Sequence, residues 1–253
     1  MPRVTRYYLG TIVVAAAAAA AVTALVVARP AQPDDRPTVF AASSLRVVLR
    51  DIDAAMPYSF AGSGALQQQI ERGAPADVFA SASPKEAQAL FREGRCGRPV
   101  TFATNRLVLL VPAGSPIHAV ADLRRRDLRL AVGAATVPVG RYTEAALGHL
   151  GLTRLLDGPR VSREKDVAGV TSKVALGSAD AGFVYHTDAL ATAGRTREIA
   201  LPAAARPHVA YQLCAVRRAG ARTAAARAFI GRVTGADGRR VLVRRGFGLP
   251  ARG

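Results

Sequence analysis

Short apolar runs alternate along this chain with segments in which apolar residues recur at helical spacing. The pattern predicts apolar strands at residues 77–80, 105–111, 128–132, 181–185 and 208–216, and helices at 45–55, 65–72, 84–93, 140–150, 167–176, 223–233 and 237–245. Pro112, Gly151 and Gly177 stop the element before them. Strands that alternate with helices in this way are typical of an α/β protein built on a parallel sheet.

The N-terminus carries a signal for export. Arg3 and Arg6 precede an uncharged run of 22 residues from Tyr7 to Ala28. Residues 1–28 are therefore either a cleaved signal peptide or a signal anchor long enough to cross a bilayer. Because the positive residues come first, the rest of the chain is expected outside the cytoplasm. No Cys lies near the end of the run, which excludes a lipoprotein anchor, and residues 29–37 are a Pro-rich polar linker.

Export also bears on the two cysteines, Cys96 and Cys214. In an oxidising compartment they can pair, and a bridge between them would close a long loop. The alternative is a pair of buried thiols.

Composition narrows the function classes. The 253 residues suffice for one large domain or two lobes. The net charge of +17 is spread along the chain, in short clusters such as Arg124–Arg126, Arg217–Arg218 and Arg244–Arg245, without the aromatic residues that stack on bases. This favours a solvated basic surface over a nucleic-acid site. Such a surface can raise the rate at which an anion encounters the protein. Four His and two Cys are too scattered for a zinc-ribbon or haem-attachment pattern, so no metal or cofactor is expected.

Four predicted helices begin at residues suited to an anion. Ser43-Ser44, Gly62-Ser63-Gly64, Pro138-Val139-Gly140 and Lys165-Asp166-Val167 stand at these starts. A helix start offers free backbone N–H groups and the positive end of the helix dipole, and glycine lets the backbone approach closely. A single serine in this position is most often a helix cap. The four starts lie in two halves of the chain, which together predict an anion held between two lobes.

Several strings of the sequence resemble a known family. They are VFAASSL (39–45), SFAGSGALQQQIERGAPADVFASAS (59–83), ATNRLVLLVP (103–112), VPVGRYTEAALGHLG (137–151) and ADAGFVYHTDA (179–189). In this order they resemble the molybdate-binding proteins of bacterial ABC importers over most of residues 38–250. The resemblance implies the type II periplasmic-binding-protein fold, with two hinge-linked α/β lobes. We expect lobe 1 at 36–104 and 210–253 and lobe 2 at 105–209.

The resemblance also implies a site. The oxyanion would be held by the hydroxyl and N–H of Ser44 and Ser63, by the N–H of Val139 and Val167, and by the hydroxyl of Tyr185. It implies a monomeric binding protein, not an enzyme, that delivers molybdate or tungstate to a membrane permease. Without the resemblance, Tyr185 is most simply interpreted as a core residue of a strand. Arg141 either adds attraction at the pocket rim or is a solvated residue of a first helical turn.

One departure and three alternatives stand beside this interpretation. The stretch from Ser44 to Ser63 is shorter than the family usually has, which predicts a missing turn and a truncated strand. An exported serine hydrolase would use Ser63, but SFAGSGA is not a G-x-S-x-G elbow and no His stands in a triad motif. A sulfate or phosphate binder is the second alternative, and a phosphate binder is expected to carry a carboxylate partner. A nucleic-acid-binding or structural membrane-anchored domain is disfavoured by export and dispersed charge.

Overall fold

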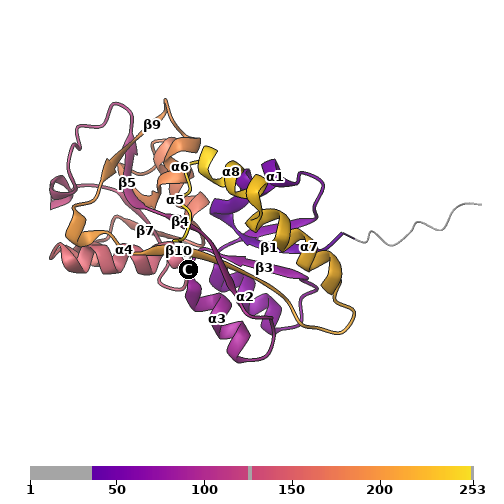
Figure 1. Cartoon of the computed structure of the whole chain (residues 1–253). Helices are drawn as coiled ribbons and strands as arrows, with labels where there is room; N and C mark the ends of the chain where they lie inside the picture. The colour runs from indigo at the N-terminus through magenta and orange to yellow at the C-terminus, as the bar shows by residue number, and fades with distance from the viewer. Residues whose placement is uncertain (1–35, 125–126, 252–253) are drawn as a thin grey trace, which may run out of the picture. The chain divides into compact units, whose positions relative to one another are not determined.

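A computed structural model describes residues 36–124 and 127–251. The predicted export segment Tyr7–Ala28, most of the linker, and Arg125 and Arg126 lie outside the described residues. Within the described ranges, no helix is long and apolar enough to cross a membrane. The described strands form two five-stranded sheets, each with its own helices. We call these two units the first and the second lobe (Figure 1).

The first lobe is built on a sheet of strand order β2-β1-β3-β10-β4. Its strands are β1 (Val39–Ala42), β2 (Tyr58–Ala61), β3 (Val78–Ser81), β4 (Val100–Asn105) and β10 (Val209–Ala215). All four residues of β2 pair in parallel with β1. The short stretch between Ser44 and Ser63 therefore still contains a strand, which carries the chain from α1 to α2.

Helices cover both faces of the first sheet. They are α1 (Arg46–Ile52), α2 (Ser63–Glu71), α3 (Pro84–Arg92), α7 (Thr223–Thr234) and α8 (Ala236–Arg244), with a 3-10 turn at Ser43–Leu45 before α1. Figure 1 shows α2 and α3 on one face and α1, α7 and α8 on the other. Local sequence explains α3: the Ser83 side chain accepts from the Lys85 N–H, Pro84 occupies the first turn, and Gly94 ends the segment at a φ of 72°.

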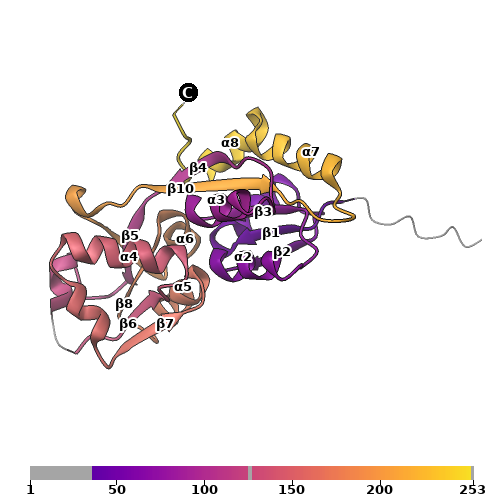
Figure 2. The same ribbon diagram turned by 90° about the horizontal axis from the view of Figure 1, so that it is seen from below.

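The second lobe has the strand order β7-β6-β8-β5-β9. Its strands are β5 (Leu107–Pro112), β6 (Leu130–Gly133), β7 (Val161–Glu164), β8 (Ala181–Tyr185) and β9 (Thr196–Ala200). Its helices are α4 (Pro138–His149), α5 (Val167–Ala175) and α6 (His186–Ala191), with 3-10 turns at Val120–Arg124, Thr153–Asp157 and Ala203–Ala205. In Figure 2, α4 lies on one side of these strands and α5 and α6 on the other.

The predicted α/β class is confirmed, and both sheets are mixed instead of wholly parallel. β1 pairs in parallel with β2 and β3, and β6 with β7 and β8. In contrast, β10 runs antiparallel to β3 and β4, and β5 antiparallel to β8 and β9. The apolar runs do not reveal this difference, because a strand buried on both faces is continuously apolar in either direction.

The chain crosses between the two sheets twice. It leaves the first sheet at the end of β4, enters β5 at Leu107 after a single intervening residue, and returns from β9 to β10. Asn105 and Val209 pair where β4 and β10 lie side by side. This distribution of strands supports the lobe limits proposed from the sequence, which stay a prediction.

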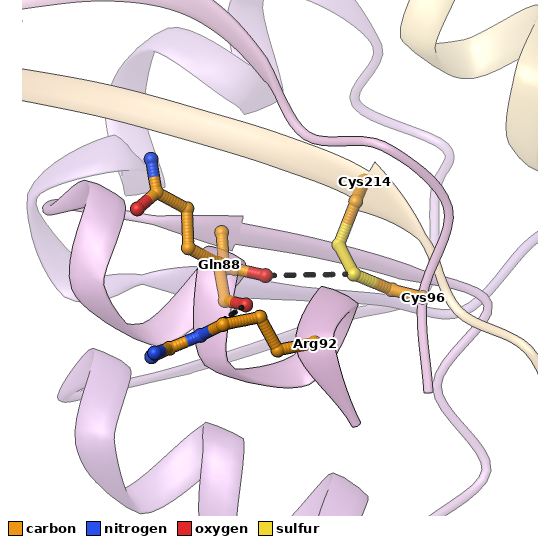
Figure 3. Close-up of a disulfide and its surroundings, with 5 residues drawn as sticks. Gln88, Arg92, Cys96 and Cys214 are labelled. Carbon is orange, nitrogen blue, oxygen red and sulfur yellow. Dashed lines mark hydrogen bonds between the residues drawn. A yellow bond between two sulfur atoms is a disulfide. The ribbon is translucent and has the colours of Figure 1, made fainter. Parts of the chain in front are cut away.

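Cys96 and Cys214 form a disulfide within the first lobe, with their Cα atoms 6.0 Å apart (Figure 3). The bridge joins the loop after α3 to β10, and its surroundings are a buried apolar cluster between the sheet and helices α2 and α3. The Cys96 sulfur lies 3.6 Å from the carbonyl oxygen of Ala87 in α3. The disulfide thus links the strand that leads to the second lobe with the helical layer of the first.

Candidate functional site

A small cavity lies between the two lobes, and all five residues predicted for the oxyanion line it. The residues that line it are Ala42, Ser43, Ser44, Ala61, Gly62, Ser63, Ala82, Val137, Pro138, Val139, Asp166, Val167 and Tyr185. Those up to Ala82 belong to the first lobe and the others to the second. The structure thus brings together helix starts that are between 76 and 123 positions apart in the sequence, from Ser63 to Val139 and from Ser44 to Val167.

The size of the cavity restricts its occupant. It has about 10 Å³ of space for the centre of a water-sized sphere. That is room for about one water, which requires roughly 10–15 Å³ on this measure. Organic ligands of drug size occupy pockets of roughly 300–1,000 Å³. An organic ligand of that size is therefore excluded from the cavity in this arrangement of the lobes.

The hydroxyls of the two serines of the first lobe do not cap helices. Ser44 lies inside the 3-10 turn and Ser63 is the first residue of α2, and neither turn has a side-chain cap. The Ser63 oxygen instead accepts from the Ala82 N–H at 3.0 Å, and the Ser44 oxygen lies 3.0 Å from the hydroxyl of Tyr211. Ser63 is 1% exposed. With its acceptor position filled by a protein donor, its own proton is free for a ligand.

Tyr185, at the end of β8, supplies the most informative atom of the site. Its side chain is 1% exposed, and its hydroxyl has no hydrogen-bond partner among the described residues. A buried hydroxyl without a partner is costly, so this hydroxyl is suited to donate to a ligand in the cavity. Burial raises the pKa of Tyr185 well above its ordinary value, so the hydroxyl keeps its proton and is a donor.

Backbone groups complete the second lobe's share of the cavity. Val139 lies in the first turn of α4 and Val167 is the first residue of α5. N–H groups in a first turn have no intrahelical acceptor, and the helix dipole places positive potential there. Among the described residues that line the cavity there is no Lys, Arg or His. Attraction for an anion therefore comes from hydroxyls, N–H groups and helix dipoles.

One lining residue changes the picture of a site made of neutral donors alone. Asp166 lines the cavity as the N-cap of α5, where its Oδ1 accepts from the Gly169 N–H at 2.9 Å. The sequence interpretation treated this position only as part of a helix start. The carboxylate is the one charged acceptor among the described residues that line the cavity, and it can receive a proton from a ligand.

Two glycines at the start of α2 set how closely the lobes approach. A Cβ on Gly62 would overlap the Lys165 carbonyl oxygen and lie 2.8 Å from Val137 Cγ1, and a Cβ on Gly64 would overlap the Thr136 carbonyl oxygen. These neighbours all belong to the second lobe. Any other side chain at either position would therefore separate the lobes beside the cavity.

Arg141 occupies neither of the two positions expected for it. Its guanidinium forms an ion pair with Glu86 of α3, donates to Ser83 Oγ at 3.4 Å and donates to the Thr136 carbonyl at 3.1 Å. Glu86 is 2% exposed and also accepts from the Ser83 hydroxyl at 2.6 Å. Arg141 belongs to the second lobe and Glu86 to the first, so this pair is a link between the lobes near the cavity.

Sequence reasoning missed Asn105 and Tyr211, which lie behind the cavity. Asn105 Nδ2 donates to the Tyr211 hydroxyl, and that hydroxyl contacts Ser44. Asn105 ends a strand of mixed polar and apolar residues and Tyr211 lies in a mostly apolar strand, and no local motif marks either residue. Elsewhere in the described part of the chain, no three His, Cys, Asp or Glu side chains gather in a way that could hold a metal ion.

Known proteins agree with this architecture. The profile of the family described as bacterial extracellular solute-binding protein matches residues 11–248. The molybdate-binding protein ModA of Mycobacterium tuberculosis is 38% identical over 239 residues, which cover 88% of each chain. ModA of Haemophilus influenzae is 34% identical over 229 residues, covering 83% of this chain and 89% of that protein.

Solved structures share the fold. The periplasmic molybdate-binding protein of Azotobacter vinelandii superimposes with a TM-score of 0.77 at 25% identity, covering 85% of this chain and all of that one. The sulfate-binding protein SubI of Mycobacterium tuberculosis matches with a TM-score of 0.70 at 18% identity, over 84% of this chain and 86% of that one, which shows the fold alone. The predicted periplasmic-binding-protein fold is thereby confirmed. The chain belongs to the bacterial extracellular solute-binding proteins, in the family of the molybdate-binding proteins.

Proposed function

We propose that this chain captures molybdate outside the cytoplasm and delivers it to the permease of an ABC importer. The observation that carries the proposal is the Tyr185 hydroxyl, which is buried at the cavity without a partner in residues 36–124 and 127–251. The identity of 38% to a molybdate-binding protein supports the choice of ligand. Tungstate, which has the same charge and shape, is expected to bind the same donors.

The chemistry of the cavity suits a small dianion. Molybdate is fully deprotonated at neutral pH and only accepts hydrogen bonds. The proposed ligand set gives it the hydroxyls of Ser44, Ser63 and Tyr185 and backbone N–H groups at Ser44, Ser63, Val139 and Val167. Hydrogen bonds to a charged group contribute roughly 1.5–3 kcal/mol each, so a set of this size needs no cationic side chain. Sulfate has the same charge and shape but is smaller, and it would leave donors unsatisfied.

Capture is proposed to proceed by closure of the two lobes, without catalysis. Donors come from both lobes, so the ion is fully surrounded only when they meet. The closed form would present the surface that a permease recognises. The family is extracellular, in agreement with the export signal proposed for residues 1–28. We further propose that the chain acts as a monomer.

Calorimetric titration with molybdate tests the proposal, with Ser63→Ala and Tyr185→Phe as the informative variants. Each removes one donor, and each is expected to weaken binding roughly 10- to 100-fold. Ser178→Ala, in an exposed turn far from the cavity, is the matched control and should bind like the parent. If both informative variants remain folded by circular dichroism and bind as tightly as the parent, the pocket lies elsewhere.

A second candidate ligand is hydrogen phosphate, favoured by Asp166. Phosphate carries a proton at neutral pH and needs an acceptor, which the Asp166 carboxylate provides. Titration with phosphate and sulfate in parallel with molybdate separates the two functions. Tight phosphate binding that Asp166→Asn abolishes, together with weak molybdate binding, would establish the second candidate and remove the first.

A further inference from the structure

Behind the cavity, a chain of side chains connects Asn105 at the end of β4, Tyr211 in β10 and Ser44. Asn105 Nδ2 lies 3.3 Å from the Tyr211 hydroxyl, and the Tyr211 hydroxyl lies 3.0 Å from Ser44 Oγ. All three residues are at least nine-tenths buried, with exposures of 9%, 0% and 8%. Resting on the proposed function, we propose that Tyr211 and Asn105 are positioning residues that orient the Ser44 hydroxyl proton toward the bound oxyanion.

The direction of the first hydrogen bond follows from the partners of Asn105. Its Oδ1 accepts from the Arg106 N–H at 2.9 Å, which places the amide nitrogen on the other side. The two Nδ2 protons then have two acceptors, the Thr187 hydroxyl at 3.0 Å and the Tyr211 hydroxyl. Because the amide nitrogen donates and does not accept, the Tyr211 oxygen is the acceptor of this bond.

The direction of the second bond follows from the first. Burial raises the pKa of Tyr211 well above its ordinary value, so its hydroxyl keeps a proton that needs an acceptor. Within the described part of the chain, Ser44 Oγ is the one partner left for that proton. If Ser44 donated instead, the Tyr211 proton would be buried without an acceptor, at a cost of roughly 1–3 kcal/mol. Tyr211 therefore donates and Ser44 accepts, which leaves the Ser44 proton for the cavity.

The Tyr211 ring is held in place for this role. Its ring contacts Phe102, Tyr185 and Phe247 edge-on, with centroids 6.2, 5.8 and 5.5 Å away. The pairing of β10 with β4 shifts register between Tyr211 and Gln212. Irregularities of this kind redirect a side chain relative to a regular strand. Tyr211 also lies in one of the two segments that join the lobes, so the relay spans the crossover.

A double-mutant cycle on molybdate affinity tests the relay. Ser44→Ala and Tyr211→Phe are each expected to weaken binding roughly tenfold. In the Tyr211→Phe background, Ser44→Ala is expected to cause a further loss of only about two- to threefold, because its proton is no longer oriented. The control cycle pairs Tyr211→Phe with Ser63→Ala, whose oxygen accepts from Ala82 instead. Those two losses are expected to multiply.

A third variant reverses the polarity of the relay while keeping its shape. Asn105→Asp has acceptors only, so the Tyr211 proton turns to the carboxylate and the Tyr211 oxygen takes the Ser44 proton. Its added charge also repels an anion, and the same substitution in the Ser44→Ala background measures that repulsion alone. We expect Asn105→Asp to weaken binding several-fold more when Ser44 is present than when it is absent.

The outcomes separate the relay from the function on which it rests. A parent protein that does not bind molybdate overturns both. The relay alone is overturned if the parent binds molybdate and two further results are found. The losses of affinity from Ser44→Ala and Tyr211→Phe then multiply like those of the control cycle, and the loss from Asn105→Asp is the same with and without Ser44. Coupling confined to the Ser44 pairs, in variants that stay folded by circular dichroism, supports it, because a merely structural role of Tyr211 would weaken both cycles alike.

Discussion

The two lobes contribute to the cavity in different ways. The first lobe offers the hydroxyls of Ser44 and Ser63, whose oxygens already contact protein partners, Tyr211 and the Ala82 N–H. The second lobe offers backbone N–H groups at Val139 and Val167 and the Tyr185 hydroxyl, which has no partner in the part of the chain that the structure describes. The first half of the site is thus oriented by the protein itself, whereas the second half lacks an acceptor until an ion arrives.

The same difference extends to the scaffold. The first lobe carries the disulfide beneath its helices, and one of its buried acids, Asp77, is paired with Arg218 and Arg222. In the second lobe, Asp188 sits mostly buried near Tyr185, and an ion pair to it is absent from the described residues. We infer that the first lobe acts as a preformed receptor and the second lobe completes the site on closure.

Removal of the disulfide tests the rigidity of the first lobe and has the largest expected effect. The bridge spans 118 residues, and in the chain-entropy model its loss lowers the free energy of unfolding by about 4–5 kcal/mol. Denaturant unfolding of Cys96→Ser/Cys214→Ser against the parent measures this, while molybdate affinity should change less than twofold. Equal unfolding midpoints of variant and parent, or free thiols in the exported parent by mass spectrometry, would show that the bridge does not stabilise this lobe.

Asp188 gives the second lobe a pH dependence. Burial raises its pKa from 3.8 to about 7, so the folded state binds this proton more tightly than the unfolded chain does. Its contribution to stability is therefore fully present below about pH 4 and is lost as the pH rises through about 7, a change of at most about 4 kcal/mol. Asp188→Asn keeps an acceptor for the Tyr185 N–H. It should remove this decrease of the free energy of unfolding with pH, measured between pH 4.5 and 8. An unchanged slope would contradict the assignment.

Gly62→Ala tests whether the lobes must meet beside the cavity. The new Cβ would overlap the Lys165 carbonyl oxygen, so the closed arrangement is disfavoured while the first lobe itself is unaffected. We expect molybdate affinity to fall roughly 100-fold with little change in the unfolding midpoint. Gly148→Ala is the matched control, because a Cβ on this helical glycine meets no atom within 4 Å. If both variants bind alike, closure does not depend on this contact.

Arg141→Ala tests the ion pair between the lobes and has the smallest expected effect. The substitution leaves Glu86 buried without its cationic partner in the closed form, whereas in an open form Glu86 would be hydrated. We expect affinity to fall roughly tenfold, mostly through faster release of molybdate in stopped-flow experiments. Arg129→Ala, which removes an exposed pair with Asp180 inside the second lobe, is the control. Equal release rates for the two variants would show that the Arg141 pair does not hold the lobes together.

Much of the fold follows from local pattern. Strand β8 and helices α3, α4, α5 and α7 lie within about two residues of their predicted limits, because each has a continuous apolar run or a capped apolar face. The sequence did not predict β1, β2, β4, β7 and β9 as strands or α6 as a helix. The residues of β2 are all half-buried and those of β7 mixed with an exposed position, so neither has an apolar run long enough to detect.

Local sequence likewise predicts some residues of the site and not others. Ser44, Ser63, Val139 and Val167 stand at helix starts, which sequence can locate, and the resemblance added Tyr185. Tyr211, Asn105 and the pair of Glu86 and Arg141 depend on contacts between segments more than 50 positions apart. Local sequence patterns do not indicate such contacts. Asp166 was located correctly as a helix start, but its place at the cavity wall follows only from the packing of α5.

The most direct test of the account is the position of the ion itself. Crystals grown with molybdate and measured at the molybdenum absorption edge give an anomalous signal that locates the metal without assumption. The account predicts one strong peak in the cavity, with its oxygens within hydrogen-bond distance of the hydroxyls of Ser44, Ser63 and Tyr185. A peak elsewhere on the protein, or none in crystals soaked to saturation, would contradict it.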